Sequence, residues 1–292
     1  MALEVRAPLD LVRTVAPLRH GPSDPTIRFL PREAIIALRT SDGPATLRLR
    51  HRGTRLLAEA WGPGSTAALA DARDLAGLDD EPERLVPVHR VIAELARNFA
   101  GVRLPTSGRP FDALVPAIIE QKVTGNEAFA AWRRLVLRHG ERAPGPWSVW
   151  IAPGPEALAG MPYHAFHPLG IERRRAEVIR AVAGLTGHLA GADRETATRL
   201  LAAMRGIGPW TIAEVRRVAF GDPDAVSVGD YHIPHLVSWV LAGEPRGSDA
   251  RMLELLEPYR GQRGRVQRLL ELSARFPPRR GPRLAARDIR RL

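Results

Sequence analysis

The chain of 292 residues contains no cysteine. This absence excludes disulfides, cysteine-bound iron–sulfur clusters, all-cysteine zinc sites and a cysteine nucleophile. The sequence also lacks any apolar run close to the roughly 20 residues that a membrane-spanning helix needs. Its first residues contain no apolar segment of the kind found in signal peptides. We therefore expect a cytoplasmic protein.

Lysine is almost absent as well. Lys122 is the only lysine among 43 basic residues, and the formal net charge is +11. Because arginine and lysine gain affinity for nucleic acids by displacing counterions from phosphates, this charge favours a polyanion as the partner. A coding bias toward arginine would give a similar composition, so general basicity stays open as the alternative. Residues 277–292 are interpreted as a separate arginine-rich tail.

Two kinds of pattern divide the rest of the chain. Residues 1–82 contain short runs with partial apolar–polar alternation at 34–39, 46–51 and 56–61, which predict a small antiparallel sheet followed by a helix at 66–76. Residues 83–276 show apolar residues at three- and four-residue spacing. That spacing predicts helices at 87–99, 110–121, 125–139, 172–184, 194–204, 209–220, 231–242, 249–257 and 262–276. The expected fold class is mainly α, with a small N-terminal α+β domain.

A turn between two of these helices forms the first functional motif. The segment LLAAMRGIGPWTIAEV, residues 200–215, places Gly206, Ile207 and Gly208 directly before Pro209. Glycines allow a tight turn and a close approach to another surface, Ile207 can pack between the two helices, and proline suits the first position of a helix. Free N–H groups of such a helix-hairpin-helix face outward and can hold a phosphate. The motif favours DNA, although helix N-termini are also general anion sites.

A second segment makes the motif more specific. Residues 225–240, AVSVGDYHIPHLVSWV, place Asp230 at the expected start of a helix. The hairpin, the amphipathic helix after it and this aspartate together resemble the HhH-GPD superfamily of base excision DNA glycosylases, and within it the AlkA type, 3-methyladenine DNA glycosylase II. The segments FDALVPAIIEQKVTG (111–125), PLGIERRRAEVIR (168–180) and PYR (258–260) resemble further blocks of that family. The similarity spans roughly residues 100–270, and it implies two helical lobes around a cleft.

The resemblance implies that Asp230 is the catalytic carboxylate. Breaking a glycosidic bond builds positive charge on the sugar, and a carboxylate stabilises that charge and can orient the attacking water. The alternative is that Asp230 only caps the following helix. Trp210 lies where glycosylases that also cut the DNA strand have a lysine, and it cannot form a Schiff base. The resemblance therefore implies a monofunctional enzyme whose base pocket Trp210 borders, while an ordinary core tryptophan stays the alternative.

DNA contacts are expected at the hairpin residues Gly206, Ile207 and Gly208. The resemblance also places Gln121 and Lys122 where the family inserts residues into the duplex, because a flipped base leaves a gap that must be filled. The AlkA type commonly has leucine as this wedge, so Lys122 is a departure, and a solvated lysine at a helix end is the alternative.

No cofactor is expected beyond a possible monovalent cation held by hairpin carbonyls. His232 and His235 are spaced as metal ligands but lack a third one, so no metal is predicted.

The predicted substrate pocket contains Trp210, Glu214, Tyr231 and Arg268. Glu214 and Arg268 stand where the family would have aromatic residues, so the aromatic cleft for cationic bases is thinned. The function that follows is hydrolytic removal of alkylated purines, such as 3-methyladenine and 7-methylguanine, from double-stranded DNA by a monomer. Two alternatives stay open. One is a non-catalytic helix-hairpin-helix protein that binds DNA damage, and the other is a glycosylase for hypoxanthine or an oxidised base.

Overall fold

The N-terminal part of the chain forms a five-stranded antiparallel sheet. The computed structural model describes residues 1–278 and 289–291. The strands are β1 (Ala2–Glu4), β2 (Ile27–Leu30), β3 (Glu33–Thr40), β4 (Gly43–Arg52) and β5 (Arg55–Trp61), in the spatial order β1-β5-β4-β3-β2. The three strands predicted from alternation therefore form the centre of the sheet. The short β1 and β2 were not predicted.

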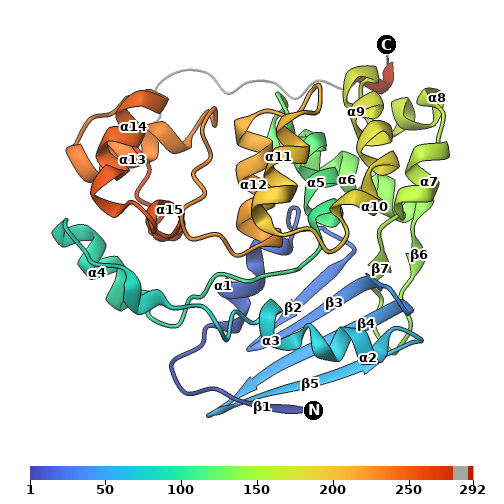
Figure 1. Ribbon diagram of the computed structural model, residues 1–292, viewed down its shortest axis with the longest axis horizontal. Coiled ribbons are helices and arrows are strands. Elements are labelled where there is room, and N and C mark those ends of the chain that lie inside the picture. The colour runs from blue at the N-terminus through green and yellow to red at the C-terminus, as the bar shows by residue number, and fades with distance from the viewer. Residues whose placement is uncertain (279–288, 292) are drawn as a thin grey trace.

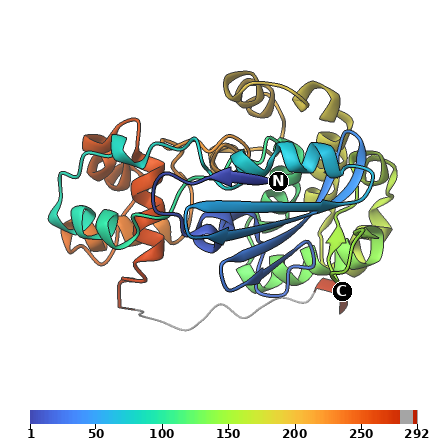
Figure 2. The ribbon, with the colours of Figure 1, turned by 90° about the horizontal axis from the view of Figure 1, so that it is seen from below.

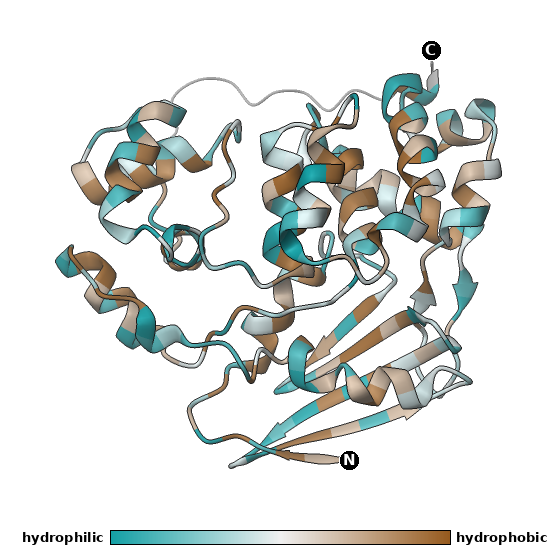
Figure 3. Ribbon diagram, viewed as in Figure 1, coloured by the Kyte–Doolittle hydropathy of each residue, from teal (hydrophilic) through white to brown (hydrophobic). Residues whose placement is uncertain are grey.

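Hydrophobic and hydrophilic residues alternate along the strands (Figure 3), so the two faces of the sheet differ. On β4, Leu47 and Leu49 are fully buried, whereas Arg48 between them pairs with Glu33 and Glu59 on the other face. The helices α1 (Leu11–Val15), α2 (Ser65–Ala70) and α3 (Ala72–Leu75) pack on the apolar face, and the 3₁₀ turn η1 (Ala16–Leu18) follows α1. The single helix predicted at 66–76 is thus divided into two short helices at Asp71.

Helices build two further bodies, which Figure 1 shows side by side. Each of them has its own apolar core. The first lobe contains α5 (Pro110–Glu120), α6 (Gly125–His139), α7 (Pro155–Gly160), α8 (Tyr163–Phe166), α9 (Arg173–Gly184), α10 (Thr186–Leu189), α11 (Arg194–Ala202) and α12 (Pro209–Ala219). The second lobe contains α4 (Arg90–Asn98), α13 (Ile233–Ala242), α14 (Asp249–Leu256) and α15 (Arg263–Leu272). Helix α5 lies at the centre of the first lobe, because nine of its eleven residues are buried.

Each predicted helix of the helical region is present, with differences mainly at the ends. The helix expected from residue 231 begins at Ile233, and the one expected to reach residue 276 ends at Leu272. The short helices α7, α8 and α10 were not predicted, nor was a small ribbon of β6 (Glu141–Arg142) and β7 (Trp150–Ile151). This ribbon packs on Ile35 of the sheet and joins the first lobe to it (Figure 2).

Most of the predicted arginine-rich tail, 277–292, lies outside the described residues. Within the part of the chain that the structure describes, no helix has the length and apolar character needed to cross a membrane.

Candidate active site

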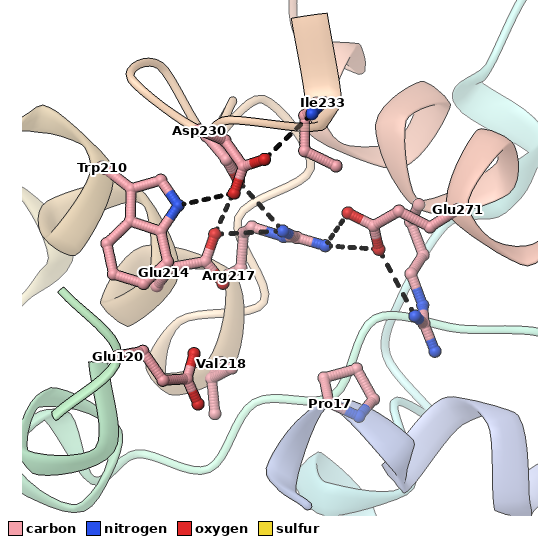
Figure 4. Close-up of a pocket in the computed structure, with 11 residues that line it drawn as sticks. Pro17, Glu120, Trp210, Glu214, Arg217, Val218, Asp230, Ile233 and Glu271 are labelled. Carbon is pink, nitrogen blue, oxygen red and sulfur yellow. Dashed lines mark hydrogen bonds and ion pairs between the residues drawn. The ribbon is translucent and has the colours of Figure 1, made fainter. Parts of the chain in front are cut away.

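A cavity of about 270 Å³ lies where the sheet domain and the two helical lobes meet (Figure 4). The turn η1 contributes one residue, α5 and α12 contribute residues of the first lobe, and the segment before α13, α13 itself and α15 contribute residues of the second. The lining residues are Pro17, Glu120, Trp210, Glu214, Arg217, Val218, Ser227, Asp230, Ile233, Arg268 and Glu271. Four of them are carboxylates, two are arginines, and Trp210 is the one aromatic residue. The cavity is therefore mainly a charged site.

Asp230 is held in place by three N–H donors. Its Oδ1 accepts hydrogen bonds from the backbone nitrogens of His232 (2.6 Å) and Ile233 (2.9 Å) at the start of α13. Its Oδ2 accepts a hydrogen bond from Nε1 of Trp210 at 3.1 Å. A carboxylate has about four acceptor positions. Three are thus occupied, and one on Oδ2 is left for a group in the cavity.

Trp210 is brought to Asp230 by the helix-hairpin-helix formed by α11, the turn and α12. Gly206 has a φ of 93°, a conformation that side chains rarely adopt, and a Cβ on it would lie 2.5 Å from Cγ2 of Val178. Ile207 is 8% exposed and belongs to the core of the first lobe, as predicted. A Cβ on Gly208 would meet no atom within 4 Å. The outer side of the turn is thus open for the approach of another molecule.

Gln121 supports this hairpin from the end of α5. Its Nε2 donates hydrogen bonds to the carbonyl oxygen of Gly206 (3.0 Å) and to Oγ1 of Thr211 (2.9 Å). Entry of Gln121 into a duplex would require breaking both of these bonds. The two bonds hold the hairpin against α5, and the duplex role of Gln121 stays a prediction.

A half-buried network of charges beside Asp230 joins the two lobes. Arg217 on α12 donates from Nη2 to both carboxylate oxygens of Glu271 on α15 at 2.9 Å, and from Nη1 to Glu214 (3.1 Å) and to Oγ of Ser227 (3.0 Å). Ser227 donates to Oε1 of Glu214 at 2.5 Å. Gln267 donates to Ser227 and to Glu271, in each case at 2.8 Å. These bonds satisfy the polar groups that the lobes bury between them.

The two glutamates of this network differ in how easily they are protonated. Burial raises the pKa of Glu214, and Arg217 with the hydroxyl of Ser227 offsets only part of that increase. Burial also acts on Glu271, but Arg217 and Arg268 outweigh it and lower the pKa of Glu271. Glu214 is therefore the lining carboxylate in this network that is easier to protonate.

Comparison with known proteins agrees with this geometry. A model of the family described as HhH-GPD superfamily base excision DNA repair protein matches residues 115–260, which include the hairpin and Asp230. The chain belongs to this superfamily.

Individual HhH-GPD relatives cover parts of the chain. It is 27% identical over 154 residues to the putative DNA-3-methyladenine glycosylase YfjP of Bacillus subtilis, a match that covers 50% of this chain and 52% of that protein. It is 30% identical over 170 residues to the probable bifunctional transcriptional activator/DNA repair enzyme AlkA of Mycobacterium tuberculosis, with 56% of this chain and 34% of that protein covered. The matches thus span about a third to a half of the length of these relatives.

The fold extends over almost the whole chain. The solved structure of a 3-methyladenine DNA glycosylase from Archaeoglobus fulgidus has a TM-score of 0.78 at 20% identity, and the match covers 94% of this chain and 99% of that one. Both the two-lobed HhH-GPD fold and the sheet in front of it, as expected from the sequence, are therefore found together in a known protein.

One residue of the predicted substrate pocket lies outside the cavity. Tyr231 was expected in the substrate pocket, but its side chain is 79% exposed and contacts the rings of His232 and His235. Asp230 lines the cavity and caps α13, whereas Tyr231, the next residue, is exposed to solvent. Lys122 is exposed in the connection between α5 and α6, with a φ of 55°. Its position leaves the wedge role as a proposal.

Trp210, Glu214, Asp230 and Arg268 do line the cavity, as their predicted pocket positions require. The aromatic side chains of Tyr163, Phe166 and Trp239 do not line it. Sequence reasoning missed the other lining residues, which are Pro17, Glu120, Arg217, Val218, Ser227, Ile233 and Glu271. Glu120 directly precedes Gln121 in the segment 111–125, which the sequence analysis had singled out. Its position near the cavity could therefore have been predicted from that segment. No described group of three or more histidine, aspartate or glutamate residues is arranged to hold a metal.

Proposed function

We propose that this protein is a monofunctional DNA glycosylase that hydrolyses the glycosidic bond of alkylated purines in double-stranded DNA. The observation that carries the proposal is the position of Asp230 on the cavity wall, fixed by Trp210 of the hairpin and by the start of α13. A base flipped into the cavity would place its sugar near this carboxylate. The negative charge then stabilises the oxocarbenium-like sugar as the bond breaks.

The remaining acceptor position on Oδ2 of Asp230 supports hydrolysis by water. A water molecule that donates to Oδ2 would be held beside the sugar and would lose its proton to the carboxylate as it attacks. The three N–H donors fix the carboxylate before the reaction, so little reorganisation is needed in the transition state.

The absence of a suitable amine supports the monofunctional assignment. A strand-cutting glycosylase needs an amine that attacks C1′ and forms a Schiff base. The only lysine in the sequence is Lys122, and it does not line the cavity. The indole of Trp210 is not a nucleophile of this kind.

The charges of the cavity support a cationic leaving base. Arg217 and Arg268 balance Glu214 and Glu271, so the carboxylates of Asp230 and Glu120 give the lining an excess of negative charge. Purines such as 3-methyladenine and 7-methylguanine carry a positive charge that weakens their glycosidic bond. With a single aromatic residue for stacking, attraction of that charge is the larger source of selectivity.

A panel of duplexes with one damaged base each tests the proposal. We expect faster release of cationic 3-methyladenine and 7-methylguanine than of neutral hypoxanthine or ethenoadenine under single-turnover conditions. Product DNA should keep an intact abasic site that breaks only after alkali, and borohydride should trap no covalent adduct. A trapped adduct would contradict the monofunctional mechanism.

Two other results would replace the proposal. Binding to damaged duplexes without release of any base would favour a non-catalytic damage-binding protein. Faster release of hypoxanthine than of the cationic purines would point to Glu214, whose pKa is raised by burial, as a general acid for neutral bases.

A further inference from the structure

The cavity wall opposite Asp230 carries a carboxylate to which the proposed hydrolysis gives no contact of its own with the base or the sugar. Glu120 is the last residue of α5, and its side chain lies across the cavity from Asp230 in Figure 4. Its Oε1 is 3.2 Å from Nδ1 of His20, 100 residues away in the sequence. Over residues 1–278 and 289–291, no hydrogen-bond partner is found for Oε2. One oxygen of Glu120 is therefore available to a molecule in the cavity.

His20 lies in a loop of the sheet domain that packs against α6 of the first lobe. Its backbone nitrogen donates to Oδ2 of Asp24 at 2.6 Å, and Nε1 of Trp132 donates to Oδ1 of the same aspartate at 3.1 Å. The rings of His20 and Trp132 meet edge-on with centroids 5.5 Å apart. Gly21, with a φ of 86°, packs so closely on Phe129 that a Cβ would lie 2.5 Å from its ring. This loop can thus hold the imidazole, and through it the carboxylate of Glu120, in one place.

Around the pair of His20 and Glu120, negatively charged groups outnumber positively charged ones. Burial lowers the pKa of His20, but the hydrogen bond and charge of Glu120, with further contributions from Asp24 and Glu214, outweigh burial and raise this pKa above its ordinary value. Three carboxylates therefore surround one imidazole. Protonated His20 balances the charge of Glu120, and neutral His20 leaves that charge facing the cavity.

We propose that Glu120 is the specificity-determining residue of the cavity: it accepts a hydrogen bond from the amino edge of a positively charged purine, and His20 positions it. This inference rests on the proposed function. When the sugar of a flipped nucleotide faces Asp230, the far edge of its base faces the opposite wall, where Glu120 lies. The amino group of 3-methyladenine shares the positive charge of the ring, so its hydrogen bond to a carboxylate is charge-assisted. Hypoxanthine is neutral and has a carbonyl oxygen in place of the amino group.

The variant Glu120→Gln tests this role because it keeps the shape of the side chain and removes its charge. We expect single-turnover release of 3-methyladenine from methylated duplex DNA to fall by about 10- to 100-fold, the range of a lost charge-assisted hydrogen bond. Release of hypoxanthine from a matched duplex should change by less than about threefold, because that base carries no charge for the carboxylate to attract. The matched control is Glu141→Gln, which also removes a paired glutamate but lies away from the cavity, beside Arg39.

Binding to a duplex with a tetrahydrofuran abasic analogue shows whether the variant is folded. This ligand has no base edge, so wild type and Glu120→Gln should bind it equally. Equal losses for 3-methyladenine and hypoxanthine, or no loss for either, would overturn the role of Glu120 and leave the proposed function standing. If wild type releases no alkylated base at all, the proposed function fails first, and this inference fails with it.

The positioning role of His20 has its own readout. In wild type, raising the pH neutralises His20 and exposes the charge of Glu120, so the ratio of 3-methyladenine to hypoxanthine release should rise with pH. In His20→Gln this rise should be smaller, because the glutamine does not titrate. Identical pH profiles in the two proteins would show that His20 has only a structural role.

Discussion

The two oxygens of Asp230 have different environments. Oδ1 accepts the two backbone N–H groups that open α13, which is the geometry of a helix cap, whereas Oδ2 accepts from Trp210 and faces the cavity. The helix-capping alternative and the catalytic hypothesis therefore describe two halves of one side chain. The capping bonds hold the carboxylate in the orientation that catalysis would use.

Asp230→Asn should separate these two tasks. An asparagine oxygen can still accept the bonds at the start of α13, but the negative charge is lost and the NH₂ group would meet the N–H of Trp210. A charge pair about 4 Å apart contributes around 4 kcal/mol at an effective dielectric of 20, so we expect the rate of base release to fall by about three decades. DNA binding should be retained or tightened. Single-turnover assays and binding titrations measure the two effects.

Asp249→Asn is a suitable control for that variant. Asp249 accepts a hydrogen bond from the backbone nitrogen of Gly229 next to Asp230 and does not line the cavity. Its substitution removes one carboxylate charge from the same region and keeps an acceptor. Comparable losses in the two variants would mean that the Asp230 effect is general electrostatics, and near-normal turnover of Asp230→Asn would remove its catalytic assignment.

The site residues differ in how well their positions could be predicted from the sequence. Asp230, Trp210 and Glu214 lie close to a recognisable hairpin, so their spacing placed them at the cavity. His20 and Glu120 approach each other only because the sheet domain packs against α5, and no local pattern records a contact across 100 residues. Tyr231 was misplaced because spacing does not give the direction of a side chain in a turn.

At the scale of elements, the hairpin contains two glycines, and a different physical requirement explains why glycine occupies each position. Gly206 has a left-handed backbone and no room for a Cβ beside Val178. Gly208 has an ordinary φ of −111° and open space around it. The first glycine is required by the fold, whereas the second leaves a smooth surface where a phosphate could approach.

Gly206→Ala and Gly208→Ala should therefore have different effects on stability and on DNA binding. Gly206→Ala should lower the free energy of unfolding by about 1–3 kcal/mol, the usual cost of a strained backbone conformation, and should also weaken DNA binding. Gly208→Ala should leave stability nearly unchanged and weaken DNA binding alone. Urea unfolding and titration with an abasic duplex distinguish the two outcomes. If Gly208→Ala binds DNA normally, the hairpin does not contact the phosphate backbone closely.

The long helices could be predicted from the periodicity of their apolar residues, whereas the short elements could not. Helices such as α5, α6 and α12 have more than ten residues, which is enough for three- and four-residue spacing to repeat. Helices of four to six residues, such as α7 and α8, and the two-residue strands β6 and β7 contain too few positions for any period. They form because of the surfaces against which they pack.

At the scale of the whole molecule, the contact between His20 and Glu120 ties the sheet domain to the first lobe in a pH-dependent way. The pKa of His20 is raised in the folded protein, so its pairing contributes stability fully below the unfolded pKa of about 6.5 and loses it as the pH rises through the folded value. We expect the difference in unfolding free energy between wild type and His20→Gln to shrink from pH 6 to pH 9. Urea unfolding at several pH values measures it. A constant difference would show that the pair does not titrate in this range.

The cavity draws its walls from three bodies, each with its own apolar core. The carboxylate proposed to act on the sugar belongs to the second lobe, while η1 and the loop of His20 reach the opposite end from the sheet domain. On the proposed function, changes in the sheet domain would alter which damaged base is accepted without touching Asp230. An evolving lineage could exchange or remodel this N-terminal module to gain new substrates while inheriting the same chemistry.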